Sequence, residues 1–252
     1  MKVVDRKRKE RFVEIDALRG CAIVMMLLYH ILFDLFFFGD LKVNLFSLFW
    51  QGYVIVGASL FIGLAGISLT LRYSREKEKG NTTPFPQYLK RGFLLLAYGM
   101  VITLVTYLAF PKAYIRFGVL HCIGTSTILA YPFLSRPYLG LLLGPVCIVL
   151  GDLLSRRSFS FPLLFWLGLR PRNFLTLDYF PLLPWFGVVL LGVSIGDLLY
   201  PSGKRRFFFP THPHPLVQGL AFLGRHSLTI YLVHQPIILA LLFVLGFIRF
   251  PW

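Results

Sequence analysis

The stretch that decides the fold runs from residue 19 to residue 34 and reads RGCAIVMMLLYHILFD. The apolar run around it, about 15 to 38, is long enough to cross a hydrocarbon layer of about 30 Å as an α-helix. Three ionisable residues interrupt this run: Arg19, His30 and Asp34. Because charged side chains inside a membrane are costly, their presence within a span indicates a pathway or a site.

The whole chain has the composition of an integral membrane protein. Of its 252 residues, 56% are hydrophobic and only 15% are charged. Apolar stretches of span length predict an all-α, polytopic transmembrane helical bundle of about seven spans, at about 15–38, 45–71, 90–110, 117–134, 138–154, 180–200 and 225–248. The stretch FPLLFWLGL, residues 161–169, is too short to span and is predicted to be interfacial or re-entrant.

Basic residues beside the predicted spans set the orientation. They are concentrated in the N-terminal segment 1–14, in LRYSREKEKG (71–80) and in GKRRFFF (203–209). Since basic loops are retained on the cytoplasmic side, we expect a cytoplasmic N-terminus. Anionic lipid headgroups explain the net charge of +15 more simply than nucleic acid does. We expect a single integral-membrane domain over residues 1–252, multi-pass in the cell membrane.

The ionisable residues of the first span share one face. At 100° per residue, Asp16, Arg19, His30 and Asp34 fall within about 60° of arc. His30 and Asp34 are four residues apart and are predicted to touch, which would fix the imidazole tautomer and raise its basicity. The pattern predicts His30 as a general base oriented by Asp34. The alternative is a satisfied buried pair without a chemical role.

Four blocks of sequence carry a family resemblance. They are EIDALRGCAIVMMLLYHILFDLFFFG (14–39), FGVLHCIG (117–124), DYFPLLPWFGVVLLGVSIG (178–196) and GRHSLTIYLVHQPI (224–237). In this order they resemble the catalytic domain of the heparan-alpha-glucosaminide N-acetyltransferase family in its short prokaryotic form, within the membrane-bound acyltransferase superfamily. The resemblance covers about residues 11 to 240.

The resemblance implies an enzyme that moves an acetyl group from cytoplasmic acetyl-CoA to an amine or hydroxyl on the far side of the membrane. In the lysosomal relatives the acceptor is a terminal glucosamine. This chain lacks their extra spans and luminal domain, and has His30 where they carry a different polar residue. The acceptor is therefore expected only to be sugar-like. Relatives also suggest a possible homodimer.

The acetyl-CoA site is expected on the first and last spans. Guanidinium groups suit the phosphates of CoA. Ser227, Tyr231 and His234, at spacings of four and three, form a polar face ahead of Pro236. Pro236 removes the amide that would reach back to Leu232, and a polar face beside this broken hydrogen bond suits the pantetheine arm. The alternative is polar contact between helices. The expected acetyl-CoA-binding residues are Arg19, Arg225, Ser227, Tyr231, His234 and Gln235.

Three further residues are candidates for binding the acceptor. The resemblance makes His121 a pocket-lining residue, although a core histidine bonded to a backbone carbonyl is an equal alternative. Asp178 either binds the acceptor or caps the start of the sixth span. Trp185 is either a sugar platform or an interfacial anchor. No metal is expected, because the sequence has no HExxH or cysteine-rich spacing.

Two other classes of function compete with the enzyme. A transporter of protons, ions or small molecules could use the same buried polar stripe, although transporters of this size often show internal repeats and none is visible. A purely structural membrane subunit would leave the first span unexplained. Direct transfer with His30 as base and transient acetylation of His30 are both open.

Overall fold

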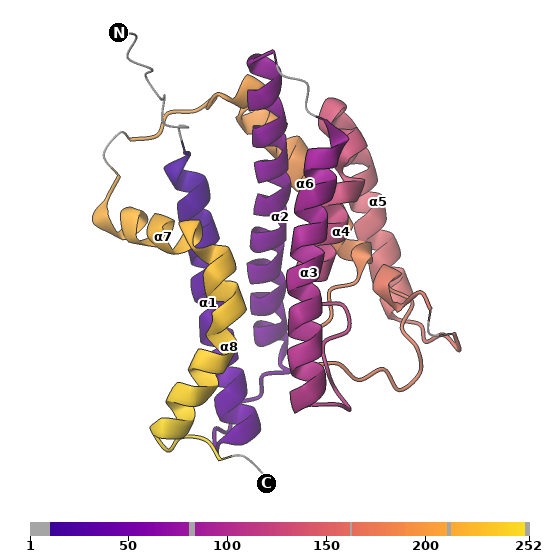
Figure 1. Cartoon of the computed structure of the whole chain (residues 1–252), viewed down its shortest axis with the longest axis vertical. Helices are drawn as coiled ribbons and strands as arrows, with labels where there is room; N and C mark the ends of the chain where they lie inside the picture. The colour runs from indigo at the N-terminus through magenta and orange to yellow at the C-terminus, as the bar shows by residue number, and fades with distance from the viewer. Residues whose placement is uncertain (1–10, 81–83, 162, 211–212, 250–252) are drawn as a thin grey trace. The chain divides into compact units, whose positions relative to one another are not determined.

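The computed structural model describes residues 11–80, 84–161, 163–210 and 213–249. These residues form helices and no β-strand beyond two isolated bridges, which confirms the all-α prediction (Figure 1). The α-helices are α1 (Val13–Phe38), α2 (Leu48–Glu78), α3 (Phe85–Ala109), α4 (Val119–Leu129), α5 (Tyr138–Ser155), α6 (Leu182–Leu199), α7 (Pro215–Arg225) and α8 (Ser227–Val244). Short 3-10 helices lie at η1 (Tyr131–Ser135), η2 (Phe165–Leu167) and η3 (Pro201–Gly203).

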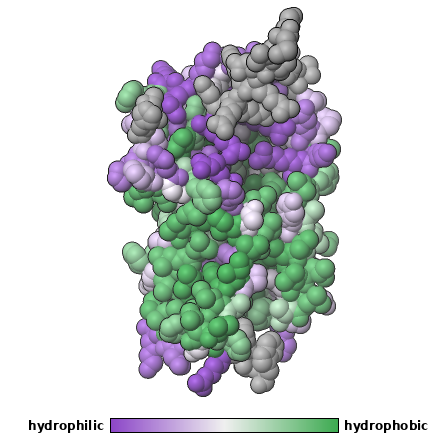
Figure 2. All heavy atoms as spheres, turned by 60° about the vertical axis from the view of Figure 1, so that its left-hand side comes forward, coloured by the Kyte–Doolittle hydropathy of each residue, from purple (hydrophilic) through white to green (hydrophobic). Residues whose placement is uncertain are grey.

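Six of the described helices are long and apolar enough to cross a membrane: α1, α2, α3, α5, α6 and α8. Apolar side chains, green in Figure 2, cover much of the visible surface of the molecule. The multi-pass prediction is thus confirmed. The N-terminal residues 1–10 of the predicted basic segment lie outside the described residues.

The predicted fourth span is shorter than expected. Helix α4 has 11 residues and is followed by η1, in which Pro132 occupies the first turn. Proline lacks the amide that would continue the α-helix, so the α-helix ends before it. The stretch 161–169 contains only the three-residue η2 among its described residues, and is too short to span, as predicted.

The chain divides into two compact units. Unit 1 comprises Met1–Leu60 and Pro210–Trp252, and unit 2 comprises Phe61–Phe209. Helix α2 begins in unit 1 and ends in unit 2.

Unit 1 contains a helix that the sequence reasoning missed. Helix α7 starts at Pro215, where a missing amide costs nothing, and the Leu216 amide donates to Nδ1 of His214 at 3.2 Å. Helices α7 and α8 both pack against α1 (Figure 1). A side chain at Gly20 or Gly224 would overlap backbone atoms of the facing helix, so glycine permits this close approach.

Unit 2 is held together by small residues between apolar helices. Gly144 on α5 faces Gly187 on α6, and Gly92 on α3 faces Gly124 on α4. Within a membrane the hydrophobic effect does not drive helices together, so close backbone packing at small residues stabilises them instead. Helix α4 is thereby fixed against α3. The first turn of α4 carries His121, one of the candidate site residues of this unit.

Candidate functional site

Two histidines far apart in sequence meet in unit 1. His30 lies on α1 and His234 on α8, and their ring centroids are 4.7 Å apart with the rings nearly perpendicular. His30 is half-buried and His234 is buried. The candidate base and a candidate donor-binding residue therefore share one location.

Backbone carbonyls decide the tautomer of both rings. Nδ1 of His30 lies 2.9 Å from the Met26 carbonyl oxygen, and Nδ1 of His234 lies 2.7 Å from the Tyr231 carbonyl oxygen. Because a carbonyl only accepts, each Nδ1 must carry the hydrogen, which leaves a lone pair on Nε2 of the neutral ring. Among the described residues nothing hydrogen-bonds to Nε2 of His30, and Nε2 of His234 is buried without a partner.

The predicted pair of His30 and Asp34 is wrong. Asp34 is fully buried, and the side-chain amide of Gln235 donates to both carboxylate oxygens, at 2.8 and 3.0 Å. Side chains on a helix lean toward its N-terminus, which carries His30 toward Met26 rather than toward Asp34. The carbonyl of Met26, and not the carboxylate, orients the imidazole.

Helix α8 presents hydrogen-bond acceptors without donors. Besides Nε2 of His234, Oε1 of Gln235 is buried and has no partner. Pro236 lies inside α8 and cannot supply an amide to the Leu232 carbonyl. On the same helix Ser227 is buried and Tyr231 is half-buried. A ligand carrying N–H or O–H groups would satisfy these acceptors.

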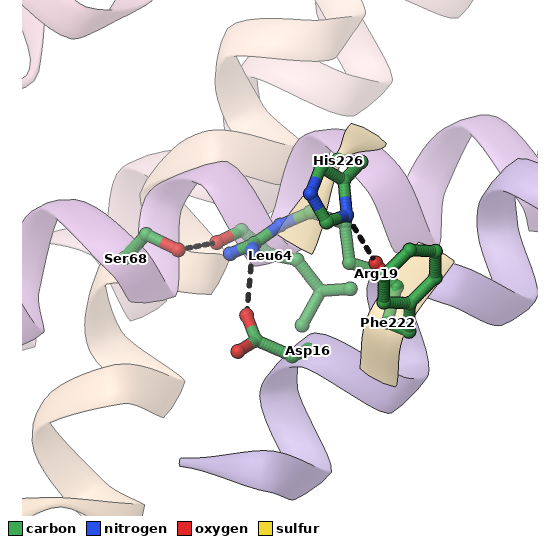
Figure 3. Close-up of polar contacts among 6 residues, drawn as sticks. All are labelled: Asp16, Arg19, Leu64, Ser68, Phe222 and His226. Carbon is green, nitrogen blue, oxygen red and sulfur yellow. Dashed lines mark hydrogen bonds and ion pairs between the residues drawn. The ribbon is translucent and has the colours of Figure 1, made fainter. Parts of the chain in front are cut away.

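The remaining candidates of unit 1 lie near the N-terminal end of α1. Nη1 of Arg19 donates to Oδ1 of Asp16 at 2.9 Å (Figure 3). Arg225 ends α7, is exposed, and stands over the Phe222 ring with its guanidinium carbon 5.9 Å from the ring centroid. Arg19 precedes His30 by eleven residues on α1, a separation of about 16 Å along the axis. Guanidinium and imidazole therefore lie at different depths.

In unit 2, Asp178 caps a different helix from the expected one. Its carboxylate accepts hydrogen bonds from the backbone amides of Val119 and Tyr179, and Val119 is the first residue of α4. Helix α6 begins later, at Leu182. Burial raises the pKa of Asp178 to about 6, although the two amide hydrogen bonds oppose that shift.

His121 in the first turn of α4 has the opposite tautomer to His30 and His234. The Gly118 amide donates to Nδ1 of His121 at 3.2 Å, so the hydrogen of the neutral ring is on Nε2. That Nε2 is buried and has no partner. Gly99 on α3 makes room for the ring, since a Cβ there would come within 2.9 Å of it.

Two further side chains of this unit, Arg116 and Trp185, lie against aromatic rings. The guanidinium of Arg116 lies 4.9 Å from the ring centroid of Tyr114 and 5.1 Å from that of Phe174, and its Nε is buried without a partner. Trp185 is half-buried on α6, with its ring 5.0 Å from that of Phe180. The sequence reasoning gave Arg116 no role, although it is adjacent to the FGVLHCIG block.

Within the described residues, no three His, Cys, Asp or Glu side chains lie close enough together to hold a metal ion. The cysteines Cys21, Cys122 and Cys147 are free thiols.

Comparison with known proteins gives one informative result. Neither the curated proteins nor the solved structures provide a match. The family model described as heparan-alpha-glucosaminide N-acetyltransferase, catalytic, matches residues 11–236, which is most of the chain. The chain therefore belongs to the heparan-alpha-glucosaminide N-acetyltransferase catalytic family of membrane acyltransferases.

Proposed function

We propose that the protein transfers an acetyl group from cytoplasmic acetyl-CoA to an amine or hydroxyl of an extracytoplasmic, sugar-like acceptor across the cell membrane. Family membership supports the reaction class. The match runs through both compact units, which supports one acyltransferase domain over residues 1–252. The concentration of basic residues near the N-terminus supports its cytoplasmic placement.

The observation that carries the proposal is the lone pair on Nε2 of His30. The Met26 carbonyl holds the hydrogen on Nδ1, so Nε2 can take the proton from the acceptor as its nitrogen or oxygen attacks the thioester carbonyl. The C–S bond then breaks, and the leaving CoA thiolate recovers the proton from the imidazolium. In the alternative course Nε2 itself attacks the thioester and carries the acetyl group before the acceptor arrives.

Asp34 supports His30 through space in this proposal. The two residues are one turn apart on α1, where Cβ atoms lie about 5–6 Å from each other. A buried carboxylate at that range stabilises the imidazolium that forms when His30 takes a proton. Gln235 holds the carboxylate in place through both oxygens.

Acetyl-CoA would donate hydrogen bonds to the unpartnered acceptor atoms on α8. Its pantetheine arm contains two amide N–H groups, which match the unpartnered Nε2 of His234 and Oε1 of Gln235. Ser227 and Tyr231 continue the polar face toward Arg225. Arg19 and Arg225 would bind the phosphates of CoA, for which guanidinium geometry is suited.

We also propose His121, Asp178 and Trp185 as acceptor-binding residues. The N–H on Nε2 of His121 can donate to a sugar oxygen, and a protonated Asp178 carboxyl can do the same. The Trp185 ring offers an apolar face suited to a sugar ring.

The test is thermal stabilisation of the purified protein in detergent by acetyl-CoA, CoA and ATP. A ligand that binds only the folded state raises the apparent Tm, so acetyl-CoA and CoA should stabilise selectively. Arg19→Ala should lose that response, while Arg157→Ala, in an exposed loop, should keep it. No response at millimolar acetyl-CoA, together with ion or proton flux in liposomes, would overturn the proposal in favour of a transporter.

A further inference from the structure

A basic and aromatic loop follows the end of α6 in unit 2. It comprises residues 204–209, KRRFFF, after η3. The Arg206 amide donates to the carbonyl of Leu199, the last residue of α6, at 3.0 Å. The loop therefore folds back onto the end of a membrane-spanning helix instead of extending away from it.

The side chains of the loop are arranged in a fixed way. The guanidinium carbon of Arg205 lies 6.0 Å from the ring centroid of Phe207 and 5.1 Å from that of Phe209. The Phe207 ring in turn packs against Tyr200, which is buried. Stacking on aromatic rings restricts the arginine before any ligand arrives, so less rotamer entropy is lost on binding.

The loop also exposes a large apolar side chain. Phe208 is 89% exposed, and its neighbour Arg206 is exposed as well. A phenylalanine so exposed next to a cation has no partner within the described part of unit 2. Both side chains become favourable at the boundary between headgroups and hydrocarbon, where aromatic rings and arginine concentrate.

The last turns of α2 add to the positive charge. The acidic residues there are each engaged by a lysine: Lys204 with Glu78 at 2.5 Å, and Lys79 with Glu76 at 3.6 Å. Contact with Glu78 raises the pKa of Lys204, which keeps it protonated. Lys77 lies between Glu76 and Glu78 in the sequence and adds a further positive charge. This end of unit 2 therefore carries more positive than negative charge.

We propose that Arg205, Arg206 and Phe208 form a binding site for the phosphate headgroup of an anionic phospholipid, in the leaflet at the C-terminal end of α6. The arginines bind the phosphate, and Phe208 inserts among the upper acyl chains. A soluble phosphate ligand would need only the arginines and would leave Phe208 in water, so the aromatic residue favours a lipid. The site is independent of the proposed function, because no step of acetyl transfer involves it.

The experiment measures lipid binding to the full-length protein by native mass spectrometry. Phosphatidylglycerol is titrated against phosphatidylcholine, without acetyl-CoA. Wild type should bind phosphatidylglycerol preferentially. Arg206→Gln and Phe208→Ser should each weaken that binding about fivefold, as expected for one surface charge or one anchoring ring. The matched controls are Arg157→Gln and Phe247→Ser, both exposed elsewhere.

Two outcomes would overturn the proposal. One is equal binding of the two lipids by wild type. The other is loss of phosphatidylglycerol binding in Arg206→Gln but not in Phe208→Ser, with inorganic phosphate or CoA competing for the site, which would indicate a soluble phosphate ligand. Size-exclusion profiles and circular dichroism check that each variant is folded.

Discussion

His30 and His234 of unit 1 differ from His121 of unit 2 in the backbone group that the ring contacts. His30 and His234 stand inside helices, where each Nδ1 lies against a carbonyl of the preceding turn. His121 is in the first turn of α4, where backbone amides lack intrahelical partners. A histidine within a helix thus presents a lone pair on Nε2, and one at a helix start presents an N–H.

Among the described residues, the unpartnered buried atoms of the candidate sites follow the same division. In unit 1, Nε2 of His234 and Oε1 of Gln235 are acceptors, whereas in unit 2 Nε2 of His121 and Nε of Arg116 are donors; the Tyr88 hydroxyl of unit 2, also unpartnered, can act as either. Only the unit 1 arrangement can take up a proton. Position along a helix, and not residue type alone, therefore separates a candidate base from a candidate hydrogen-bond donor.

The largest expected effect is that of His30→Ala. Removing a general base should lower kcat for acetyl transfer by about 10²–10⁴-fold. The matched control is His226→Ala, because Nδ1 of His226 lies 2.9 Å from the Phe222 carbonyl in the same geometry (Figure 3). Steady-state kinetics in detergent should show kcat of the control within about threefold of wild type. An equal loss of kcat in both variants would show that His30 has no special role as a base.

Asp178→Asn should change how stability depends on pH. The pKa of Asp178 in the folded protein is about 6, above its ordinary value of 3.8, so the folded state binds the proton more tightly. Its stabilising contribution is complete below pH 3.8 and is lost as pH rises through 6. The variant lacks this loss and should gain up to about 3 kcal/mol on wild type between pH 4 and 7.

The measurement for this variant is the apparent Tm in buffered detergent at several pH values. Asp40→Asn, at an exposed position, is the control and should follow wild type at every pH. A difference in apparent Tm between Asp178→Asn and wild type that stays constant with pH would contradict the raised pKa of the Asp178 carboxyl.

Asp34→Asn tests the electrostatic support of His30. The neutral amide cannot stabilise an imidazolium as a carboxylate does. It also has only one oxygen to accept a hydrogen bond from Gln235, where the carboxylate has two. We expect a decrease in kcat of about 10–100-fold, smaller than for His30→Ala. Steady-state kinetics of acetyl transfer measures it. An unchanged kcat would assign Asp34 to helix packing alone.

The smallest effect is expected at His121. His121→Ala should raise KM for the acceptor about 2–10-fold, as expected for one lost hydrogen bond, and leave kcat near wild type. His121→Gln retains both an acceptor for the Gly118 amide and an N–H donor, so it should restore KM. A loss in kcat as large as that of His30→Ala would show that the two histidines act alike.

Several site features could be predicted from sequence because they depend on local spacing. The common face of Arg19, His30 and Asp34 follows from helical periodicity. The Met26 carbonyl was also predictable in principle, since every histidine within a helix has a carbonyl four residues before it. Its competition with Asp34 for the imidazole was not, because Gln235, which occupies the carboxylate, lies 201 residues away.

Sequence alone determined that this is an all-α, multi-pass membrane protein of its family, because hydrophobic length and local motifs are properties of the chain itself. Tertiary structure alone decided that His30 meets His234, that Gln235 holds Asp34, and that Asp178 caps α4 rather than α6. Periodicity states which face a residue occupies. It does not state which distant residue packs against that face, because close packing and the satisfaction of buried polar groups select that partner in three dimensions.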